Sequence, residues 1–249
     1  MPRRMLSQKL WAKLRHILLA ESIYDKPRLR QTVEGMLYRM RVGCPWRDLP
    51  RAFGPWTTIY QRFRAWATSG KWRRIFHACI ADPDLEWAFV DGSYAKAHQH
   101  SAGGRDAQFQ AIGPSRAGRT TKIHLAVDAY GLPIAFEITG GQINDCSIGP
   151  ALIGATPRAD IIIADKGYDS DRVRAAIKTR SSQPVIPRRR HSRRPNPDFD
   201  SGLYRYRHLV ENAFERLKQY RALACRFDKL KAHYEAVVAM ACTLLWLPM

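Results

Sequence analysis

The sequence predicts an α/β protein in which a mixed central sheet is covered on both faces by helices and follows a small all-α region. Apolar residues recur at helical spacing up to about residue 80. Beyond that point come short continuous apolar runs, such as WAFV at 87–90 and IIIA at 161–164, which are typical of strands in a covered sheet. No GxGxxG or P-loop motif is present, so we expect no nucleotide cofactor.

Residues 1–82 are expected to form a helical DNA-binding domain. Helices are predicted over residues 8–20, 29–41 and 56–68. The third helix buries an aromatic stripe and presents Thr58, Gln61 and Arg62 on its other face. A polar face on the last helix of such a unit suits the major groove of DNA, and plain solvation is the alternative. We therefore predict DNA contacts from these three residues.

The region from residue 83 onward is expected to hold the sheet. Strands are predicted over 86–92, 121–128, 132–139, 159–164 and 184–187. Helices are predicted over 145–153, 170–179 and 204–218, with a last core helix within 236–249. Three antiparallel strands, a helix and two further strands with helices make a mixed sheet covered on both faces. The polar loop between the first two strands is expected to be mobile without DNA; it contains Gly103, Gly104, Gly113 and Gly118 together with Arg105, Arg116 and Arg119.

Two aspartates end apolar runs of the predicted sheet. Asp91 follows 87–90 and Asp165 follows 161–164. An acidic residue at the carboxyl end of a strand lies at the rim of an α/β sheet, where ligands usually bind. One such aspartate is common, whereas two together with a helical glutamate indicate a three-carboxylate metal site.

The glutamate lies on the predicted helix 204–218, for which Ser201 is the expected N-cap. At about 100° per residue, Tyr204, Arg207, Glu211 and Lys218 fall within an arc of roughly 60°. The opposite side of this helix is apolar. Taken alone, the polar side reads as an exposed face with helical charge pairs, but a carboxylate between cations and a phenol also suits phosphates and a metal.

These residues carry a resemblance to a known family. The spacing Tyr204-x2-Arg207-x3-Glu211-x6-Lys218 resembles the signature of DDE transposases from bacterial insertion sequences, most closely the insertion-sequence-five family of the RNase H-like superfamily. The stretches CPWRDLPRAFGPWTTIYQRFRAW, VDGSYAKAHQH, TTKIHLAVDAYGLPIAF, GGQINDC and ADKGYDS resemble that family in the same order. The resemblance implies an RNase H-like catalytic domain over 83–249 and a catalytic triad of Asp91, Asp165 and Glu211.

The chemistry expected of such a triad is metal-dependent. Oxygen-only ligation selects Mg²⁺ or Mn²⁺ over zinc, and two ions about 4 Å apart suit an in-line phosphoryl displacement. The expected reactions are cleavage at the ends of an insertion sequence and strand transfer of the freed 3′-hydroxyl into target DNA. Tyr204, Arg207 and Lys218 are expected to contact DNA. Asp145 is either a support of this site or an ordinary helix N-terminal charge.

The charge balance also indicates a nucleic-acid partner. The chain has 41 Lys and Arg against 22 Asp and Glu, a formal net charge of +19, and double-stranded DNA is the polyanion that would offset it. Five arginines fall within seven positions at the start of the basic loop 188–203. We predict a phosphate clamp that includes Arg188, Arg189 and Arg190, with a solvated linker as the alternative.

The remaining features of the sequence bear on the cellular compartment and on the alternative functions of the protein. Five widely spaced cysteines without a CxxC motif indicate reduced packing residues, and His98-x-His100 is a weak metal candidate. We expect a cytoplasmic, nucleoid-associated protein with no membrane segment, and a homodimer, since two transposon ends must meet. The alternatives to a transposase are an RNase H-like nuclease that does not join strands and a domesticated DNA-binding regulator.

Overall fold

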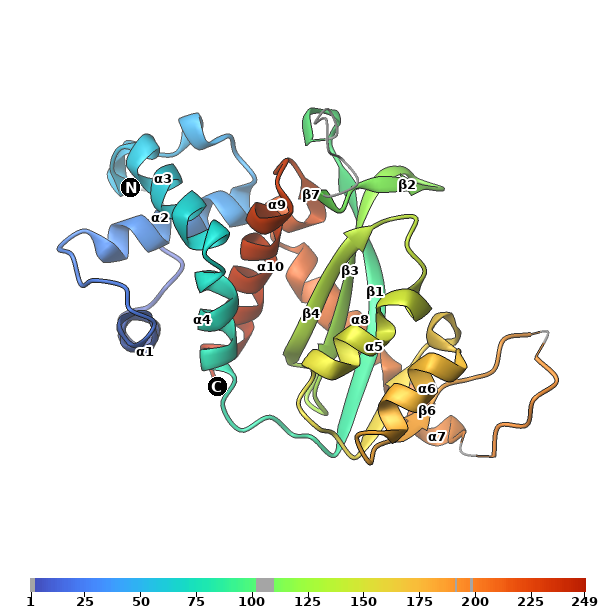
Figure 1. The fold of residues 1–249 in the computed structure, drawn as a ribbon. Helices are drawn as coiled ribbons and strands as arrows, with labels where there is room; N and C mark the ends of the chain where they lie inside the picture. Colours follow the sequence, from blue (N-terminus) through green and yellow to red (C-terminus); the bar gives the residue numbers. More distant parts are fainter. Residues whose placement is uncertain (1–2, 102–109, 191, 198) are drawn as a thin grey trace. The chain divides into compact units, whose positions relative to one another are not determined.

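The computed structural model describes residues 3–101, 110–190, 192–197 and 199–249 (Figure 1). The chain divides into two compact units: unit 1 is Met1–Ala81, Ala97–Arg105 and Leu217–Met249, and unit 2 is Asp82–Lys96 and Asp106–Arg216. The boundary expected after residue 82 lies next to a unit boundary. The C-terminal segment, which was expected in the second domain, belongs to unit 1 instead. Of the predicted polar loop, Gly103, Gly104 and Arg105 lie outside the described residues, whereas Gly113 and Gly118 begin the strands Gly113–Ser115 and Gly118–Val127 and do not belong to a loop.

Unit 1 is mainly helical and is built around its last helix, α10 (Lys231–Trp246). The other elements are α1 (Gln8–Ala20), α2 (Leu29–Val42), α3 (Trp56–Thr68), α4 (Lys71–Cys79), α9 (Arg221–Ala224), the 3₁₀ turns η1 (Trp46–Asp48), η2 (Arg51–Phe53) and η3 (Gln99–Ser101), and β7 (Cys225–Arg226). Helix α10 packs against α3 and α4. Its residues Tyr234, Met240 and Trp246 are buried. A helix that is apolar on nearly every side is thus the core of unit 1.

The limits of the N-terminal helices follow from their sequence. Ser7 caps α1, with its hydroxyl accepting from the Leu10 amide at 3.2 Å. Gly43 ends α2 in the left-handed conformation at φ 72°, which glycine adopts without strain. The helices predicted over 8–20 and 56–68 are confirmed, and the one predicted over 29–41 extends by one residue.

A buried ion pair ties α2 to the C-terminal part of unit 1. The two guanidinium nitrogens of Arg39 donate to the two carboxylate oxygens of Asp228 at 2.9 and 3.2 Å. Both side chains are almost fully buried. Because breaking such a pair leaves an uncompensated buried charge, these residues hold the distant chain segments of unit 1 together.

Unit 2 contains a mixed sheet. Its strands are β1 (Trp87–Ala97), β2 (Gly113–Ser115), β3 (Gly118–Val127), β4 (Pro133–Gly140), β5 (Ile161–Ala164) and β6 (Gln183–Val185). The order is β2-β3-β1-β5-β6, and β4 also pairs with β3. Strands β1, β3 and β4 pair antiparallel, whereas β5 and β6 are added in parallel. This is the antiparallel-then-parallel sheet that the sequence predicts.

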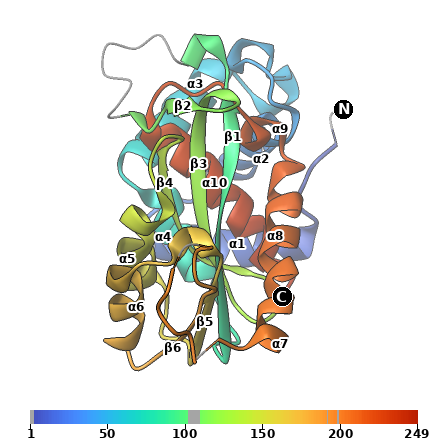
Figure 2. The ribbon, with the colours of Figure 1, turned by 90° about the vertical axis from the view of Figure 1, so that its right-hand side faces the viewer.

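Helices cover both faces of this sheet, as Figure 2 shows. Helices α5 (Asp145–Ala155) and α6 (Asp171–Lys178) pack against each other on one side, with the 3₁₀ turn η5 (Lys166–Tyr168) beside them. The other side carries α7 (Ser201–Tyr204), the 3₁₀ turn η6 (Arg205–Arg207) and the part of α8 (His208–Lys218) that belongs to unit 2. The predicted α/β architecture with flanking helices is confirmed.

Two local expectations are wrong. The first strand, predicted over 86–92, does not end at Gly92, because β1 continues to Ala97 as the antiparallel partner of β3, while its parallel partner β5 ends beside Val90. The helix of the YRYRHLVENAFERLK stretch is not capped by Ser201. The carboxylate of Asp200 accepts from the amides of Gly202 and Leu203 at 2.7 and 3.0 Å, and the helix tightens into η6 before α8 begins.

The remaining sequence features have structural roles. All five cysteines are free thiols, with Cys79 and Cys242 buried, as expected of packing residues. The rings of His98 and His100 stack at 4.8 Å, and His98 Nδ1 accepts from the His100 amide at 3.3 Å. Within the described part of the chain, no helix combines the length and the apolar character that crossing a membrane requires.

Candidate active site

The parallel pairing of β1 with β5 places two carboxylates side by side. Val90 pairs with Ala164, so the next residues, Asp91 within β1 and Asp165 directly after β5, are neighbours at the point where the parallel pairing of the two strands ends. Asp91 accepts the amide of Gly92 at 2.8 Å, and Asp165 accepts the amide of Gly167 at 2.9 Å. Each carboxylate is therefore held in place by the backbone that follows it.

The third acid comes from the other side of the sheet, and Arg207 connects it to Asp91. Arg207 Nη2 lies 2.9 Å from Asp91 Oδ2 and 3.7 Å from Glu211 Oε1. The Tyr204 ring lies 5.5 Å from the same guanidinium, and its hydroxyl is 3.5 Å from Nη1. The structure thus brings Arg207 into contact with Asp91 and places Tyr204 and Glu211 beside the same guanidinium.

Burial and like charges determine the electrostatics of this cluster. The pKa of Asp91 is raised to about 6, mainly by burial and to a lesser extent by the charges of Asp165 and Glu211, while Arg207 and the Gly92 amide oppose the rise. Asp91 therefore interacts with both Asp165 and Glu211, although the three acids are far apart in the sequence.

The donor set fits a divalent cation that prefers oxygen ligands. The acids supply only carboxylate oxygens, and a cation between them would relieve their mutual repulsion. Within the described residues, no three His, Cys, Asp or Glu side chains are close enough to hold one ion together. Instead, the Arg207 guanidinium supplies the positive charge between Asp91 and Glu211.

The raised pKa of Asp91 predicts a pH-dependent stability. An acid whose pKa is higher in the folded state favours folding below the unfolded value of about 3.9, and that contribution is lost as pH rises through about 6. Asp91→Asn removes the charge that is costly to bury. In EDTA we expect it to raise the melting temperature relative to wild type at pH 7.5 and not at pH 4.5. At pH 7.5 the gain in the free energy of unfolding is at most about 3 kcal/mol, because the lost pairing with Arg207 offsets part of it.

The measurement is thermal unfolding of both proteins at the two pH values. Every other titrating group is common to wild type and variant, so their difference isolates Asp91 and its partner. An identical difference at pH 4.5 and pH 7.5 would show that Asp91 does not titrate in this range.

A fourth carboxylate, Asp145, adjoins the cluster. Asn144 caps α5, and Asp145 is the first helical residue. Both of its oxygens accept from Lys122 Nζ, at 2.8 and 3.0 Å. A Cβ atom at Gly92 would lie 3.0 Å from one of these oxygens, and a Cβ atom at Gly167 would lie 3.0 Å from the other. Asp145 therefore lies against the backbone that follows both catalytic-candidate aspartates.

Sequence reasoning missed the buried polar group beneath Asp145. His124 Nδ1 is 3.1 Å from the Tyr168 hydroxyl, and Nε2 is 2.9 Å from Thr139 Oγ1. Burial lowers the pKa of His124 to about 4, so the ring is neutral at pH 7. The available signal was the apolar strand TTKIHLAV, in which Lys122 and His124 share one face at the period of two.

The arginines of the basic loop differ in their surroundings. Arg188 Nη1 donates to Asp169 Oδ1 at 3.1 Å, and the Arg189 amide donates to Asp169 Oδ2 at 3.0 Å. Arg190 is exposed. The three arginines predicted as one clamp are thus not equivalent, because Asp169 anchors the first two.

The other predicted DNA contacts belong to unit 1. Thr58 and Gln61 are exposed on α3, whereas Arg62 is half-buried and donates to Thr32 Oγ1 at 3.2 Å. Lys218 is the last residue of α8, and its partial burial lowers its pKa. DNA contacts by these four residues of unit 1 therefore stay predictions.

Two family models cover most of the chain. The model described as the transposase DDE domain matches residues 83–246, and that described as a putative transposase of the IS4/5 family matches residues 6–76. The chain belongs to the DDE transposases of bacterial insertion sequences, which are enzymes that act on DNA. DDE domains are RNase H-like, so the expected fold class is confirmed, and they use divalent metal ions.

Individual relatives of this chain are also named as transposases. A putative transposase for insertion sequence element IS6501 from Brucella ovis is 35% identical over 51% of this chain and 98% of its own length. A putative transposase for element IS402 from Burkholderia cepacia is 34% identical over 52% of this chain and 64% of its own length. Among solved structures, a piggyBac transposase synaptic complex with hairpin DNA matches 97% of this chain and 73% of its own chain, with a TM-score of 0.51 at 12% identity. That likeness shows the fold alone.

Proposed function

We propose that the protein cleaves DNA at the ends of its insertion sequence in a Mg²⁺- or Mn²⁺-dependent reaction and transfers the freed 3′-hydroxyl into target DNA. The observation that carries this proposal is the meeting of Asp91 and Glu211 at one guanidinium, with Asp165 on the neighbouring strand. Three acids from separate segments, one with a pKa raised to about 6, are the arrangement that divalent cations stabilise.

Asp91, Asp165 and Glu211 would hold two metal ions. When bound, such ions activate water and neutralise the charge on the reacting phosphate. Asp91 lies between the other two acids, because it neighbours Asp165 across the sheet and shares Arg207 with Glu211. We therefore assign it the ligand position common to both ions.

Arg207 and Tyr204 would bind the DNA phosphate beside the acids. Their pairing with Asp91 keeps a cation at the site. Once divalent ions neutralise the carboxylates, the guanidinium can donate two parallel hydrogen bonds to a phosphate. Lys218 is proposed as a further phosphate contact on the same helix.

In the basic loop 188–203, Arg189 and Arg190 are proposed as the principal DNA contacts. Asp169 binds the side chain of Arg188 and the backbone amide of Arg189 and so positions the loop, while the side chains of Arg189 and Arg190 are exposed for the DNA backbone. Thr58 and Gln61 on the exposed face of α3 are proposed to read the transposon ends.

The assembly that carries out this reaction is proposed to be a homodimer on two DNA ends. The piggyBac neighbour was solved as a synaptic complex with hairpin DNA, which supports such an arrangement by analogy of fold. The division into helical and RNase H-like domains at 82/83, and an association with the nucleoid, are part of the same proposal.

Incubation of the purified protein with labelled DNA from the flanks of its own gene tests the proposed function. With Mg²⁺ or Mn²⁺ we expect a 3′-hydroxyl end at the insertion-sequence boundary and, with added target DNA, joined products. Cleavage without joining would identify a nuclease. Binding of the ends without cleavage under either metal would identify a regulator and would overturn the proposal.

A further inference from the structure

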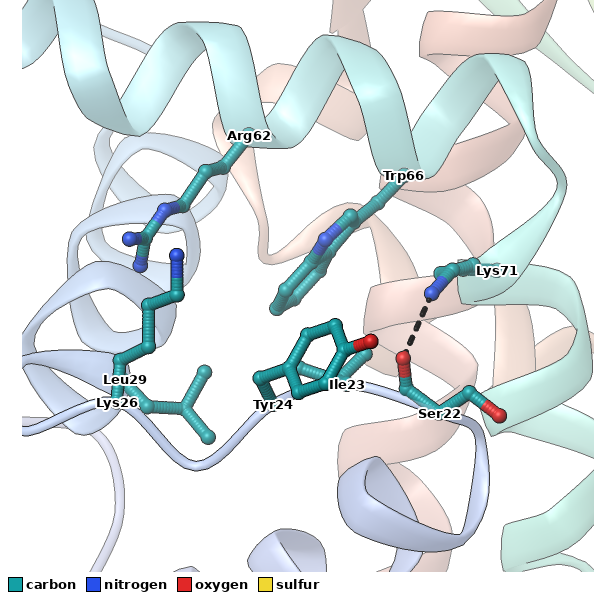
Figure 3. A pocket seen from close by; sticks show the side chains of 8 residues that line it. All are labelled: Ser22, Ile23, Tyr24, Lys26, Leu29, Arg62, Trp66 and Lys71. Atoms are coloured by element: carbon teal, nitrogen blue, oxygen red, sulfur yellow. Dashed lines mark hydrogen bonds between the residues drawn. The ribbon is translucent and has the colours of Figure 1, made fainter.

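A small pocket lies within unit 1, where the turn after α1 meets α3 and the start of α4 (Figure 3). Its volume is about 170 Å³, several times the space that one water molecule occupies. Tyr24, Lys26, Arg62, Trp66 and Lys71 are among the residues that line it. The pocket therefore combines three cationic side chains with two aromatic rings.

Two of the three cations of this pocket converge. The ammonium group of Lys26 and the guanidinium group of Arg62 point toward one another across the opening, as Figure 3 shows. Lys71 Nζ donates to the Ser22 carbonyl at 3.1 Å, on the opposite wall. Positive groups that approach one another repel, and an anion bound between them turns that repulsion into attraction.

The acids nearest in sequence are paired with other arginines. Glu21 accepts from Arg74 Nε at 3.1 Å, and Asp25 accepts from Arg15 Nε at 3.2 Å. Within the described part of the chain, no acid forms an ion pair with Lys26 or Arg62. The pocket therefore keeps its positive charge.

Arg62 is fixed in place without being neutralised. Its Nη1 donates to the hydroxyl of Thr32 at 3.2 Å, which orients the guanidinium into the pocket. A hydroxyl partner leaves the full positive charge of Arg62 available, and the planar fork of an arginine matches the oxygens of a phosphate.

The aromatic residues give the pocket an apolar rim. Tyr24 is 84% exposed, the largest value among the exposed large hydrophobic side chains of the described residues. Trp66 is almost buried and packs on Trp72 with the rings 5.7 Å apart. A fixed cationic pocket with an exposed phenol ring at its edge suits a phosphate that is joined to a sugar and a base.

We propose that this pocket binds a phosphodiester group of the DNA backbone, with Lys26 and Arg62 as the phosphate ligands and Tyr24 against the adjoining sugar or base. This inference rests on the proposed DNA binding by the N-terminal helices. It changes the role of Arg62, which positions the backbone and does not read bases together with Thr58 and Gln61.

The test compares Lys26→Ala, Arg62→Gln and the control Lys9→Ala by fluorescence anisotropy on an end-sequence duplex and a random duplex, from 50 to 200 mM salt. Lys9→Ala is the matched control because it also removes one positive charge. Lys9 is exposed on α1 and does not line the pocket. We expect each pocket variant to lose affinity for both duplexes equally, by roughly threefold to tenfold, and to lower the salt slope by about one. Lys9→Ala should keep the wild-type slope.

Three outcomes would overturn the proposal. If Arg62→Gln reduces only the preference for the end sequence, Arg62 reads bases. If Lys26→Ala and Arg62→Gln keep wild-type affinity and slope, the pocket does not contact DNA. If inorganic phosphate raises the melting temperature of wild type but not of Lys26→Ala, while DNA affinity is unchanged, the pocket binds free phosphate. Wild-type binding and cleavage of end DNA are measured in parallel, and their absence would count against the proposed function itself.

Discussion

Asp91→Asn, Asp165→Asn and Glu211→Gln each abolish DNA cleavage and strand transfer while leaving DNA binding in EDTA intact. Each change keeps the shape of the side chain and removes a negative oxygen ligand. We expect the rate of end cleavage in Mg²⁺ to fall by more than about a hundredfold. Loss of a residue that only hydrogen-bonds to a metal ligand can already lower activity by about that factor, and loss of the ligand itself should cost more. The measurement is the rate of appearance of the nicked end under single-turnover conditions.

The matched control for these variants is Asp160→Asn. Asp160 precedes β5 in the same unit, and its side chain is 66% exposed beside Arg158. Loss of one surface carboxylate should leave both the cleavage rate and the melting temperature unchanged within error. Wild-type cleavage by any of the three acid variants would remove that residue from the proposed set of metal ligands.

The sequence contained enough to predict where the aspartates lie and too little to predict what they touch. Apolar runs identify buried strands, and each run here is followed by an acidic residue, so Asp91 and Asp165 were found without a structure, although β1 continues past Asp91. Their adjacency depends on the pairing of Val90 with Ala164, which joins residues more than seventy positions apart. Local patterns carry no signal for such a register.

Long-range charge pairs were inaccessible for the same reason. Arg207 reads as a surface cation of an amphipathic helix, but in the structure it bonds to Asp91, 116 positions away. The sequence leaves Asp145 as either a support of the site or an ordinary helix N-terminal charge, and only the fold shows that Lys122 holds it against the glycines that follow the two aspartates.

The C-terminal helix shows a different limit. Its continuous apolar character predicts burial, and α10 is buried. A helix that is apolar on every side has no single apolar face, so its sequence does not indicate which element it packs against. Its place in unit 1, against α3 and α4, came only from the structure.

A single methyl group at Gly167 should inactivate the site without unfolding the protein. In Gly167→Ala the new Cβ atom would lie 2.8 Å from Asp165 Oδ1 and 3.0 Å from Asp145 Oδ2. The backbone of Gly167 also donates the hydrogen bond that holds Asp165 Oδ1, so the carboxylate cannot keep both its partner and its position. Displacement of a reacting group by about 1 Å can cost about a hundredfold in rate, and we expect a loss of that size in Mg²⁺-dependent cleavage.

Gly154→Ala provides the comparison, because it makes the same chemical change within α5, where no atom lies within 4 Å of the added Cβ. Alanine is the better helix former, so this variant should be as active as wild type and more stable by about 0.5–1 kcal/mol. Cleavage rates and melting temperatures of the two variants separate a displaced carboxylate from a general loss of fold. If Gly167→Ala cleaves DNA at the rate of Gly154→Ala, the position of Asp165 beside Gly167 is not needed for the reaction. If Gly167→Ala is inactive and also unfolded at the assay temperature, the methyl group disturbs the packing of unit 2 as a whole, and the expectation of an intact fold is wrong.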